Sequence, residues 1–301
     1  MKADNRRRLA RAVLECGPPD AANPVAPVVI GGRVLGGTTY NGGANNAGTV
    51  FSLTPPASPG DAWSESVLHS FGGPGDGANP NSALVGGLGG VLYGVTFAGG
   101  ASNYGTVFSM TPPSSPGGLW TETVIHSFDD AGAGYNPEGL AIGSGGVIFG
   151  TTLNGGSAGI GTVFALTPPA SAGGVWQFHT LHSFQNGNDG ANPNTGVTIG
   201  ADGVLYGTTP TGGAATTCCP VTGNGTVYSL APPEVAGDPW TETVLYDFSD
   251  TADGFTPSSG VVIRDGVLYG TTEHSGACGC YFGGTIYSLT PATAGPRGPL
   301  A

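Results

Sequence analysis

Short runs of residues rich in Val, Thr, Tyr and Phe recur along the whole chain and are separated by Gly, Pro and Asp-Gly. The clearest run is VLYGVT at 91–96, which returns as VLGGTT at 34–39, VIFGTT at 147–152, and VLYGTT at 204–209 and 267–272. β-Branched and aromatic residues bounded by turn residues are typical of short β-strands. Successive copies are 57, 56, 57 and 63 residues apart, so the pattern predicts a tandem repeat of small sheets.

Each repeat contains four such runs, which we call a, b, c and d. In the second repeat they are SALVGG at 82–87, VLYGVT at 91–96, TVFSMT at 106–111 and TETVIHSF at 121–128. Proline pairs follow run c in four repeats and should end that strand, because proline cannot donate to a sheet ladder. ADG at 201–203 and RDG at 264–266 should form the hairpin turns from a to b. Four strands in a unit of about 40 to 60 residues predict a β-propeller blade.

The last repeat stops after run c, and a replacement for its run d lies at the other end of the chain. ARAVLECGPPDAANP at 10–24 aligns with SESVLHSFGGPGDGANP at 64–80. We therefore predict an all-β propeller of five four-stranded blades, in which residues 8–16 supply the fourth strand of the last blade. Closure removes exposed sheet edges, whereas an open array would need capping repeats. The domain would span 8–291, between a disordered basic N-terminus at 1–7 and a flexible tail at 292–301.

Composition and charge narrow the functional classes. Gly and Pro make up 82 of the 301 residues, a share typical of disordered chains unless the two recur with a period, as they do here. The net charge is −12, and five of the eight basic residues lie in the first eleven positions, so the repeats offer no basic surface to nucleic acid. No apolar run reaches the roughly 18 residues of a membrane span, and Arg11 and Glu15 interrupt the only candidate signal peptide.

The consensus of the repeats, LYGTT..GG....GTVFSLTPP....WTETVLHSF....DGANP..GL, resembles the GloVer-type tandem repeat of bacteria over residues 10–291. The resemblance implies a secreted or surface-anchored protein, and it brings no catalytic residues with it. No anchor is visible at the end of this chain, PRGPLA. The strand order is also similar, more weakly, to kelch blades, which occur both in binding modules and in oxidases, so that similarity selects no function.

Some polar residues recur in run d of several repeats. One position holds His69, His126, His182 and then Tyr246, and another holds Glu65, Glu122 and Glu242. A histidine repeated in blade after blade is no unique catalytic base, so we expect these histidines to be packed or bonded in turns. We expect the glutamates to lie on a solvated outer edge that discourages edge pairing. The tryptophan that precedes each run d should cover a junction between blades.

The connection from d to a carries an aspartate followed by glycine in three repeats, namely Asp76, Asp189 and Asp253. Asp-Gly favours a tight turn in which the carboxylate accepts from local N–H groups. Calcium is the alternative, since NGNDG at 186–190 and DTADG at 250–254 offer oxygen ligands, but without the spacing of a known calcium loop. Strands b and d run in the same direction, so the b–c and d–a loops should share one face, called here the loop face, where we expect ligand.

Cysteines mark the b–c loops of the fourth and fifth repeats, which depart from the repeat pattern. These loops carry Cys218, Cys219, Cys278 and Cys280, and the fifth cysteine, Cys16, would end the closing strand. In a secreted chain, disulfides between the two loops are the simplest interpretation, followed by free thiols. Zinc is a rival with Glu273 and His274 nearby, but CC followed by CxC is no ordinary zinc spacing.

Residues that break the repeat are the candidates for chemistry, namely Glu138, Asp247, Glu273 and His274. A glycosidase needs two carboxylates that flank the scissile bond, and the sequence does not show that two converge. We therefore expect a monomeric, extracellular or cell-surface binding or scaffold module without catalysis, cofactor or metal. Its protein or glycan ligand would contact Asp76, Asp189, Asp253, Glu273 and His274. The alternative is a carbohydrate-active enzyme that uses the repeat-breaking carboxylates.

Overall fold

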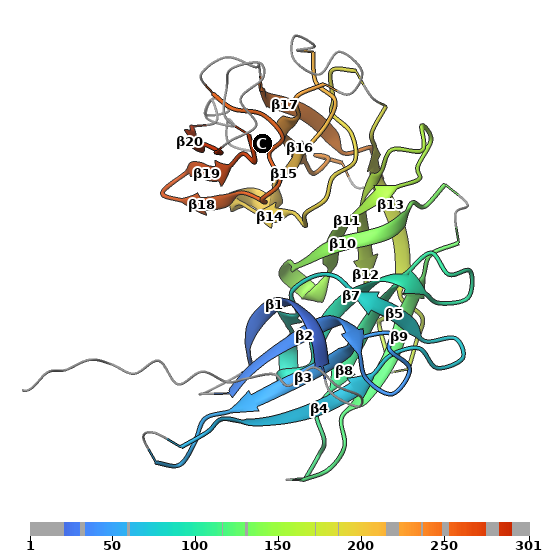
Figure 1. Ribbon diagram of the computed structural model, residues 1–301. Helices are drawn as coiled ribbons and strands as arrows, with labels where there is room; N and C mark the ends of the chain where they lie inside the picture. Colours follow the sequence, from blue (N-terminus) through green and yellow to red (C-terminus); the bar gives the residue numbers. More distant parts are fainter. Residues whose placement is uncertain are drawn as a thin grey trace, which may run out of the picture. The chain divides into compact units, whose positions relative to one another are not determined.

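A computed structural model describes residues 21–30, 34–58, 61–115, 117–129, 132–171, 173–185, 187–214, 223–235, 237–248, 253–274 and 283–290. The regular elements of this described part are β-strands apart from three short 3₁₀ turns, as predicted (Figure 1). The chain divides into two compact units, Met1–Ser127 and Phe128–Ala301. No helix in the described ranges is long and apolar enough to cross a membrane.

The first unit contains two antiparallel sheets, called blade 1 and blade 2. Blade 1 consists of β1 (Ala21–Ile30), β2 (Val34–Gly42), β3 (Thr49–Thr54) and β4 (Ser64–Ser70), hydrogen-bonded in chain order. Blade 2 consists of β5 (Gly77–Pro80), β6 (Val85–Gly86), β7 (Leu92–Gly99), β8 (Thr106–Thr111) and β9 (Thr121–Ser127). β5 and β6 pair with successive parts of β7, so together they serve as the first strand of the blade.

The second unit contains three sheets. Blade 3 consists of β10 (Tyr135–Ile142), β11 (Ile148–Asn154), β12 (Thr162–Thr167) and β13 (Gln177–Ser183). Blade 4 consists of β14 (Thr198–Ile199), β15 (Leu205–Thr209), β16 (Thr226–Ala231) and β17 (Thr241–Asp247). Blade 5 contains three strands among the described residues, β18 (Val262–Arg264), β19 (Val267–Thr271) and β20 (Ile286–Leu289). The short 3₁₀ turns η1 (Leu88–Gly90), η2 (Ser144–Gly146) and η3 (Ala201–Gly203) join strands a and b of blades 2, 3 and 4.

The predicted strand order is confirmed in blades 1 to 4, whose strands follow the order a, b, c, d, and the described strands of blade 5 follow the order a, b, c. Strand c ends directly before the proline pair in all four blades that have one. Asp202 and Asp265 take positive φ in the a–b turns, as tight hairpin turns require. The predicted closing strand at 8–16 and the segments 1–7 and 292–301 lie outside the described residues.

Strand a begins earlier than the predicted run a, which in the second repeat starts at residue 82. It begins at the Asn-Pro motif that precedes this run. β1 and β10 contain this motif, and in blade 2 it forms β5. The residue before the proline has φ between 54° and 58° in every blade, at Asn23, Asn79, Asn136, Asn192 and Thr256. Asparagine tolerates this left-handed conformation, which allows strand a to pair with b both before and after the irregularity.

A threonine pair joins the last part of strand b to the start of strand c in each blade. Thr152 and Thr162 are fully buried, with their Oγ1 atoms 2.9 Å apart. Thr152 Oγ1 also accepts from the backbone N–H of Thr162 and donates to the carbonyl of Asn154. The other copies are Thr39–Thr49, Thr96–Thr106, Thr209–Thr226 and Thr272–Thr285. Each hydroxyl is thereby satisfied inside the sheet, which permits its burial.

Within each unit, the hydrophobic core lies between successive blades. Phe71 and Phe184, at the end of strand d, are fully buried and insert into the core of the next blade. Phe71 meets Phe108 edge-on at 5.0 Å, and Phe184 meets Tyr228 at 5.2 Å. Trp120 and Trp240 pack against these cores, which confirms the prediction that tryptophan covers blade junctions.

Candidate functional site at the blade junctions

The loop face is held together by the backbone of neighbouring blades. The d–a segment after one blade donates to the b–c loop of that blade, from Asn79 N to Ala47 O at 2.7 Å and from Asn192 N to Ile160 O at 2.8 Å. The side chains of the same asparagines donate to Tyr40 O at 2.9 Å and to Leu153 O at 3.0 Å. The b–c and d–a loops therefore share one face, as predicted, and hold each other in position.

At the junction of blades 1 and 2, a histidine, an aspartate and a glutamate come together. His69 lies near the end of β4, and its Nε2 is 3.0 Å from Asp76 Oδ2 in the d–a loop. The other oxygen of Asp76 accepts from the backbone N–H of Gly77 at 2.6 Å. The His69 ring contacts Phe71 edge-on at 4.7 Å. The turn prediction for Asp76 and the packed or turn-bonded prediction for His69 are both confirmed.

Glu122, on β9 of blade 2, completes this cluster. One ligand atom from each of His69, Asp76 and Glu122 lies within 4.8 Å of the other two. Burial raises the pKa of Glu122 to about 7, the negative charge of Asp76 raises it further in the same direction, and His69 opposes this shift. Our expectation that Glu122 lies on a solvated edge is therefore wrong, because this face of strand d is turned towards the junction and not towards water.

The junction of blades 3 and 4 repeats the arrangement in a looser form. His182 Nε2 is 3.4 Å from Asp189 Oδ2, and the same oxygen accepts from the backbone N–H of Gln185 at 2.9 Å. Burial lowers the pKa of His182, although Asp189 acts against this shift. Burial, followed by the charge of Asp189, raises the pKa of Glu242 to about 7. Glu65 is also half-buried, so the solvated-edge expectation fails for all three glutamates.

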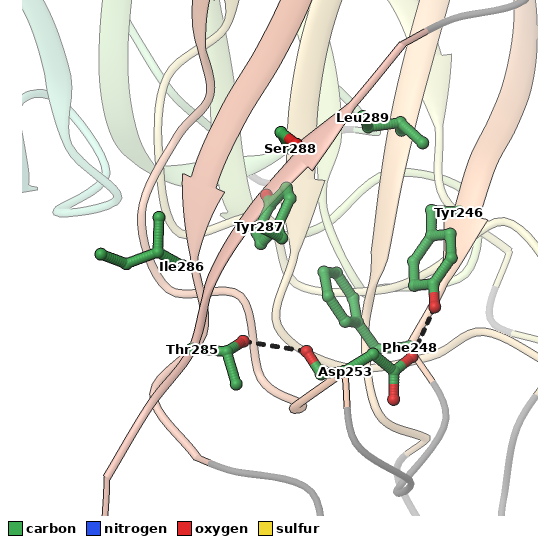
Figure 2. A pocket seen from close by; sticks show the side chains of 8 residues that line it. All are labelled: Tyr246, Phe248, Asp253, Thr285, Ile286, Tyr287, Ser288 and Leu289. Atoms are coloured by element: carbon green, nitrogen blue, oxygen red, sulfur yellow. Dashed lines mark hydrogen bonds between the residues drawn. The ribbon is translucent and has the colours of Figure 1, made fainter.

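A cavity lies at the junction of blades 4 and 5. Tyr246 holds the histidine position and donates to Asp253 Oδ2 at 2.6 Å, which raises the pKa of Tyr246 to about 12. Asp253 also accepts at its backbone carbonyl from Thr285 Oγ1. Figure 2 shows these groups around a cavity of about 300 Å³. It is lined by Tyr246, Phe248, Asp253 and the segment from Thr285 to Leu289.

Two further predicted residues lie near this junction. Glu273 is exposed, and its backbone N–H donates to Thr256 O at 3.0 Å. His274 stacks in a tilted geometry on Phe255, with 4.8 Å between ring centroids. The structure therefore gathers Asp253, Glu273 and His274 around one d–a loop, whereas Asp76 and Asp189 lie at the corresponding loops of other junctions.

The remaining candidates for catalysis are held in separate environments. Asp247 Oδ1 accepts from the backbone N–H of Ala214 at 3.0 Å. Glu138 lies on β10, next to Gly139, whose backbone closely approaches that of Gly196 in blade 4. Burial raises the pKa of Glu138 to about 8, so this carboxyl group is largely protonated at neutral pH. All five cysteines, including Cys16, lie outside the described residues. The disulfides predicted among Cys218, Cys219, Cys278 and Cys280 therefore stay a prediction.

The sequence matches a model of the Gloeobacter/Verrucomicrobia repeat in two overlapping segments, residues 9–215 and 115–297. The chain belongs to this family. The resemblance that the repeats indicated is therefore confirmed over nearly the whole chain. A comparison with curated proteins finds no match.

Solved structures similar to this Gloeobacter/Verrucomicrobia repeat protein include two enzymes. A gluconolactonase from Xanthomonas campestris aligns over 89% of this chain and 72% of its own, with 13% identity and a TM-score of 0.49. An exo-1,5-α-L-arabinanase from a bovine ruminal metagenomic library aligns over 90% and 92%, with 13% identity and a TM-score of 0.39. At these scores, neither likeness bears on the chemistry of this family member.

The sequence reasoning missed Glu122 and Glu242 as site residues, although the repeats contain a signal for them. In the third repeat, Ala133 stands at the position of the loop aspartate and Phe178 at the position of the strand glutamate. Phe178 stacks on Phe164 at 5.5 Å. Loop and strand positions thus change together in this repeat.

Proposed function

We propose that this chain is a five-bladed β-propeller that acts as a non-enzymatic binding or scaffold module outside the cell or at its surface. The protein or glycan ligand would bind on the loop face, near Asp76, Asp189, Asp253, Glu273 and His274. The observation that carries this proposal is the loop face itself, where repeated backbone hydrogen bonds hold b–c and d–a loops in fixed positions. A rigid surface with residues that vary between repeats suits recognition, because little ordering cost falls on binding.

The ring would be one domain at 8–291 in which residues 8–16 form the fourth strand of blade 5. The four complete blades set the register, since each has a bulge after the second residue of strand c. By analogy, Ser288 would pair with Ala12 and Leu289 with Arg11, just as Ser52 pairs with Ser66 and Leu53 with Glu65.

Exposure of β20 supports this closure. Ile286 is 86% exposed, whereas Val50, Val107, Val163 and Val227 at the same position of the other blades are completely buried. An exposed β-branched residue at a strand edge favours pairing with a further strand. A closed ring would cover Ile286 as the four valines are covered.

Charge supports the same register. In the alignment, Arg11 corresponds to Glu65, Glu122 and Glu242, and it would therefore face Asp253 across the cavity of Figure 2. The glutamates meet a loop aspartate of like charge, whereas Arg11 would bring the opposite charge to Asp253. An arginine in this cavity could also donate two parallel hydrogen bonds to the carboxylate.

The second candidate is a carbohydrate-active enzyme, and the high pKa of Glu138 favours it. A carboxyl group that keeps its proton near neutral pH can act as a general acid. The partner carboxylate that a glycosidase needs would have to come from Asp247 or Glu273. The Asp247 carboxylate already accepts from a backbone N–H, and Glu273 is exposed. We therefore favour the binding module.

An array of immobilised bacterial and plant polysaccharides tests the two candidates together. The binding module should retain at least one polysaccharide without releasing sugar, and Asp189→Asn should weaken retention while Glu138→Gln leaves it unchanged. Release of reducing sugar that Glu138→Gln abolishes would instead establish the enzyme. Retention of no polysaccharide by the folded protein would contradict the glycan ligand.

A further inference from the structure

We propose that His69, Asp76 and Glu122 form a binding site for one divalent transition-metal ion, with Zn²⁺ as the best fit. The site lies between blades 1 and 2 of the first unit and shares only Asp76 with the proposed recognition of glycan or protein. Among the described residues, it is the one place where three groups able to ligate a metal come together.

The separations suit a tetrahedral ion. Zn²⁺ binds imidazole nitrogen and carboxylate oxygen at about 2.0–2.2 Å, so two ligands at the tetrahedral angle lie about 3.3–3.6 Å apart. His69 Nε2 and Asp76 Oδ2 are 3.0 Å apart, and the Glu122 oxygen is within 4.8 Å of both. A small rotation of the Glu122 side chain would complete three protein ligands and leave a fourth position open.

The ligand groups are held in place before any ion binds. Asp76 keeps Oδ2 for the cluster, because its Oδ1 is engaged by the backbone N–H of Gly77. The edge-on contact with Phe71 orients the His69 ring. Fixed second contacts of this kind orient first-shell ligands in metal sites.

Glu122 provides the second observation that points to a cation. Its Oε1 is buried, and no donor in the described part of the chain reaches it. Its carboxylate oxygen also lies within 4.8 Å of a carboxylate oxygen of Asp76, so two groups able to carry negative charge face one another. A divalent ion would neutralise both carboxylates and supply the missing partner of the buried oxygen.

The junction of blades 3 and 4 shows what this site has in addition. There, Oδ2 of Asp189 already accepts from Gln185 N and also faces His182. The residue that corresponds to Gln185 in the first junction is Gly72, whose N–H donates instead to Gly77 O. The first junction therefore leaves its carboxylate oxygen available to a metal, and the second does not.

Nitrogen and oxygen donors define the class of ion. One imidazole with two carboxylates suits Zn²⁺ or Co²⁺ better than Ca²⁺, which prefers six to eight oxygen ligands. The proposed zinc site differs from our initial expectation of no metal and from the calcium alternative at Asp189 and Asp253.

Titration of the full-length protein with Co²⁺ and Zn²⁺ tests the proposal. We expect one ion whose Co²⁺ spectrum lacks sulfur-to-metal charge transfer, which separates the site from any site made by the five cysteines. Glu122→Gln should weaken binding at least tenfold, and its matched control Glu242→Gln should bind like the wild type. His69→Gln serves as a second loss variant if Glu122→Gln does not fold.

Two results would overturn the proposal. One is unchanged affinity in a folded Glu122→Gln or His69→Gln variant. The other is binding that occurs only through thiolate ligands, or not at all, in the folded wild-type protein. The polysaccharide array is read through Asp189→Asn, a residue of another junction, so the two proposals fail separately although they share Asp76.

Discussion

At the scale of single residues, the buried threonine pairs are the most regular polar feature of the repeats. Thr152 makes three hydrogen bonds inside blade 3, and all of them depend on its hydroxyl group. Removal of that group takes the acceptor from the Thr162 N–H and the donor from the Asn154 carbonyl, whereas the Thr162 hydroxyl can still donate to Ala133 O at 3.2 Å. Unsatisfied buried groups cost about 1–3 kcal/mol each.

We therefore predict that Thr152→Val lowers the free energy of unfolding by about 1–3 kcal/mol, although valine has nearly the same shape. Thr152→Ser keeps the hydroxyl and is the matched control, with a smaller loss. Urea denaturation of the two variants measures the difference. An equal loss in both would show that the methyl group, and not the hydrogen bonds, matters at this position.

Glu138 gives a prediction about pH. Burial raises its folded-state pKa from 4.5 to about 8, so the folded protein binds more protons than the unfolded chain between these values. Stability from this group is complete below about pH 4.5 and is lost progressively as the pH rises towards 8. Glu138→Gln removes the ionisable group and should abolish this loss.

Thermal unfolding at pH 5 and pH 8.5 checks that prediction. Between pH 5 and pH 8.5, the free energy of unfolding of the wild type should fall by about 1–3 kcal/mol relative to that of Glu138→Gln. This is the usual range for a buried group left unfavourably charged. A parallel change in both proteins would mean that Glu138 ionises normally in the folded state.

At the scale of elements, much of the structure could be predicted from the sequence. The Val- and Thr-rich runs, the proline pairs and the Asp-Gly turns specify strand order locally, and the sheets follow it. The early start of strand a could not be predicted in this way, since the Asn-Pro motif looks like a loop. Its pairing depends on the positive φ of the asparagine and on contacts with the preceding blade.

The candidate site was only half predictable for a similar reason. The aspartates were recognised because Asp-Gly has a local turn preference. Glu122 was misjudged because alternation along a strand shows which residues share a face, but not what covers that face. Another blade covers it, and that contact appears in the sequence only as the joint change to Ala133 and Phe178.

Strand d of blade 5 gives a prediction for this scale. If Arg11 faces Asp253, a double-mutant cycle with Arg11→Gln and Asp253→Asn should show a coupling of about 0.5–1 kcal/mol. Arg7 lies before the proposed strand, so Arg7→Gln should show no coupling free energy with Asp253→Asn. Additive effects of Arg11→Gln and Asp253→Asn would contradict the proposed register.

At the scale of the whole molecule, the proposed five-bladed ring depends on a fourth strand in blade 5. Blades 1 to 4 each contain strands a to d, with strand a of blade 2 divided into β5 and β6, and blade 5 has three strands among the described residues. The fourth strand would come from residues 8–16, which would join the two ends of the repeat array. A closed ring leaves no sheet edge unpaired at the last blade and fixes the loop face as one surface.

Hydrogen–deuterium exchange of the full-length protein tests this claim most directly. Closure predicts that the amides of residues 11–16 are protected to about the same degree as those of β4 and β9, the fourth strands of blades 1 and 2 (Figure 1). It also predicts that deletion of residues 1–17 removes protection from β20. Exchange of residues 11–16 at the rate of an unstructured peptide, with β20 unaffected by the deletion, would contradict the five-bladed ring.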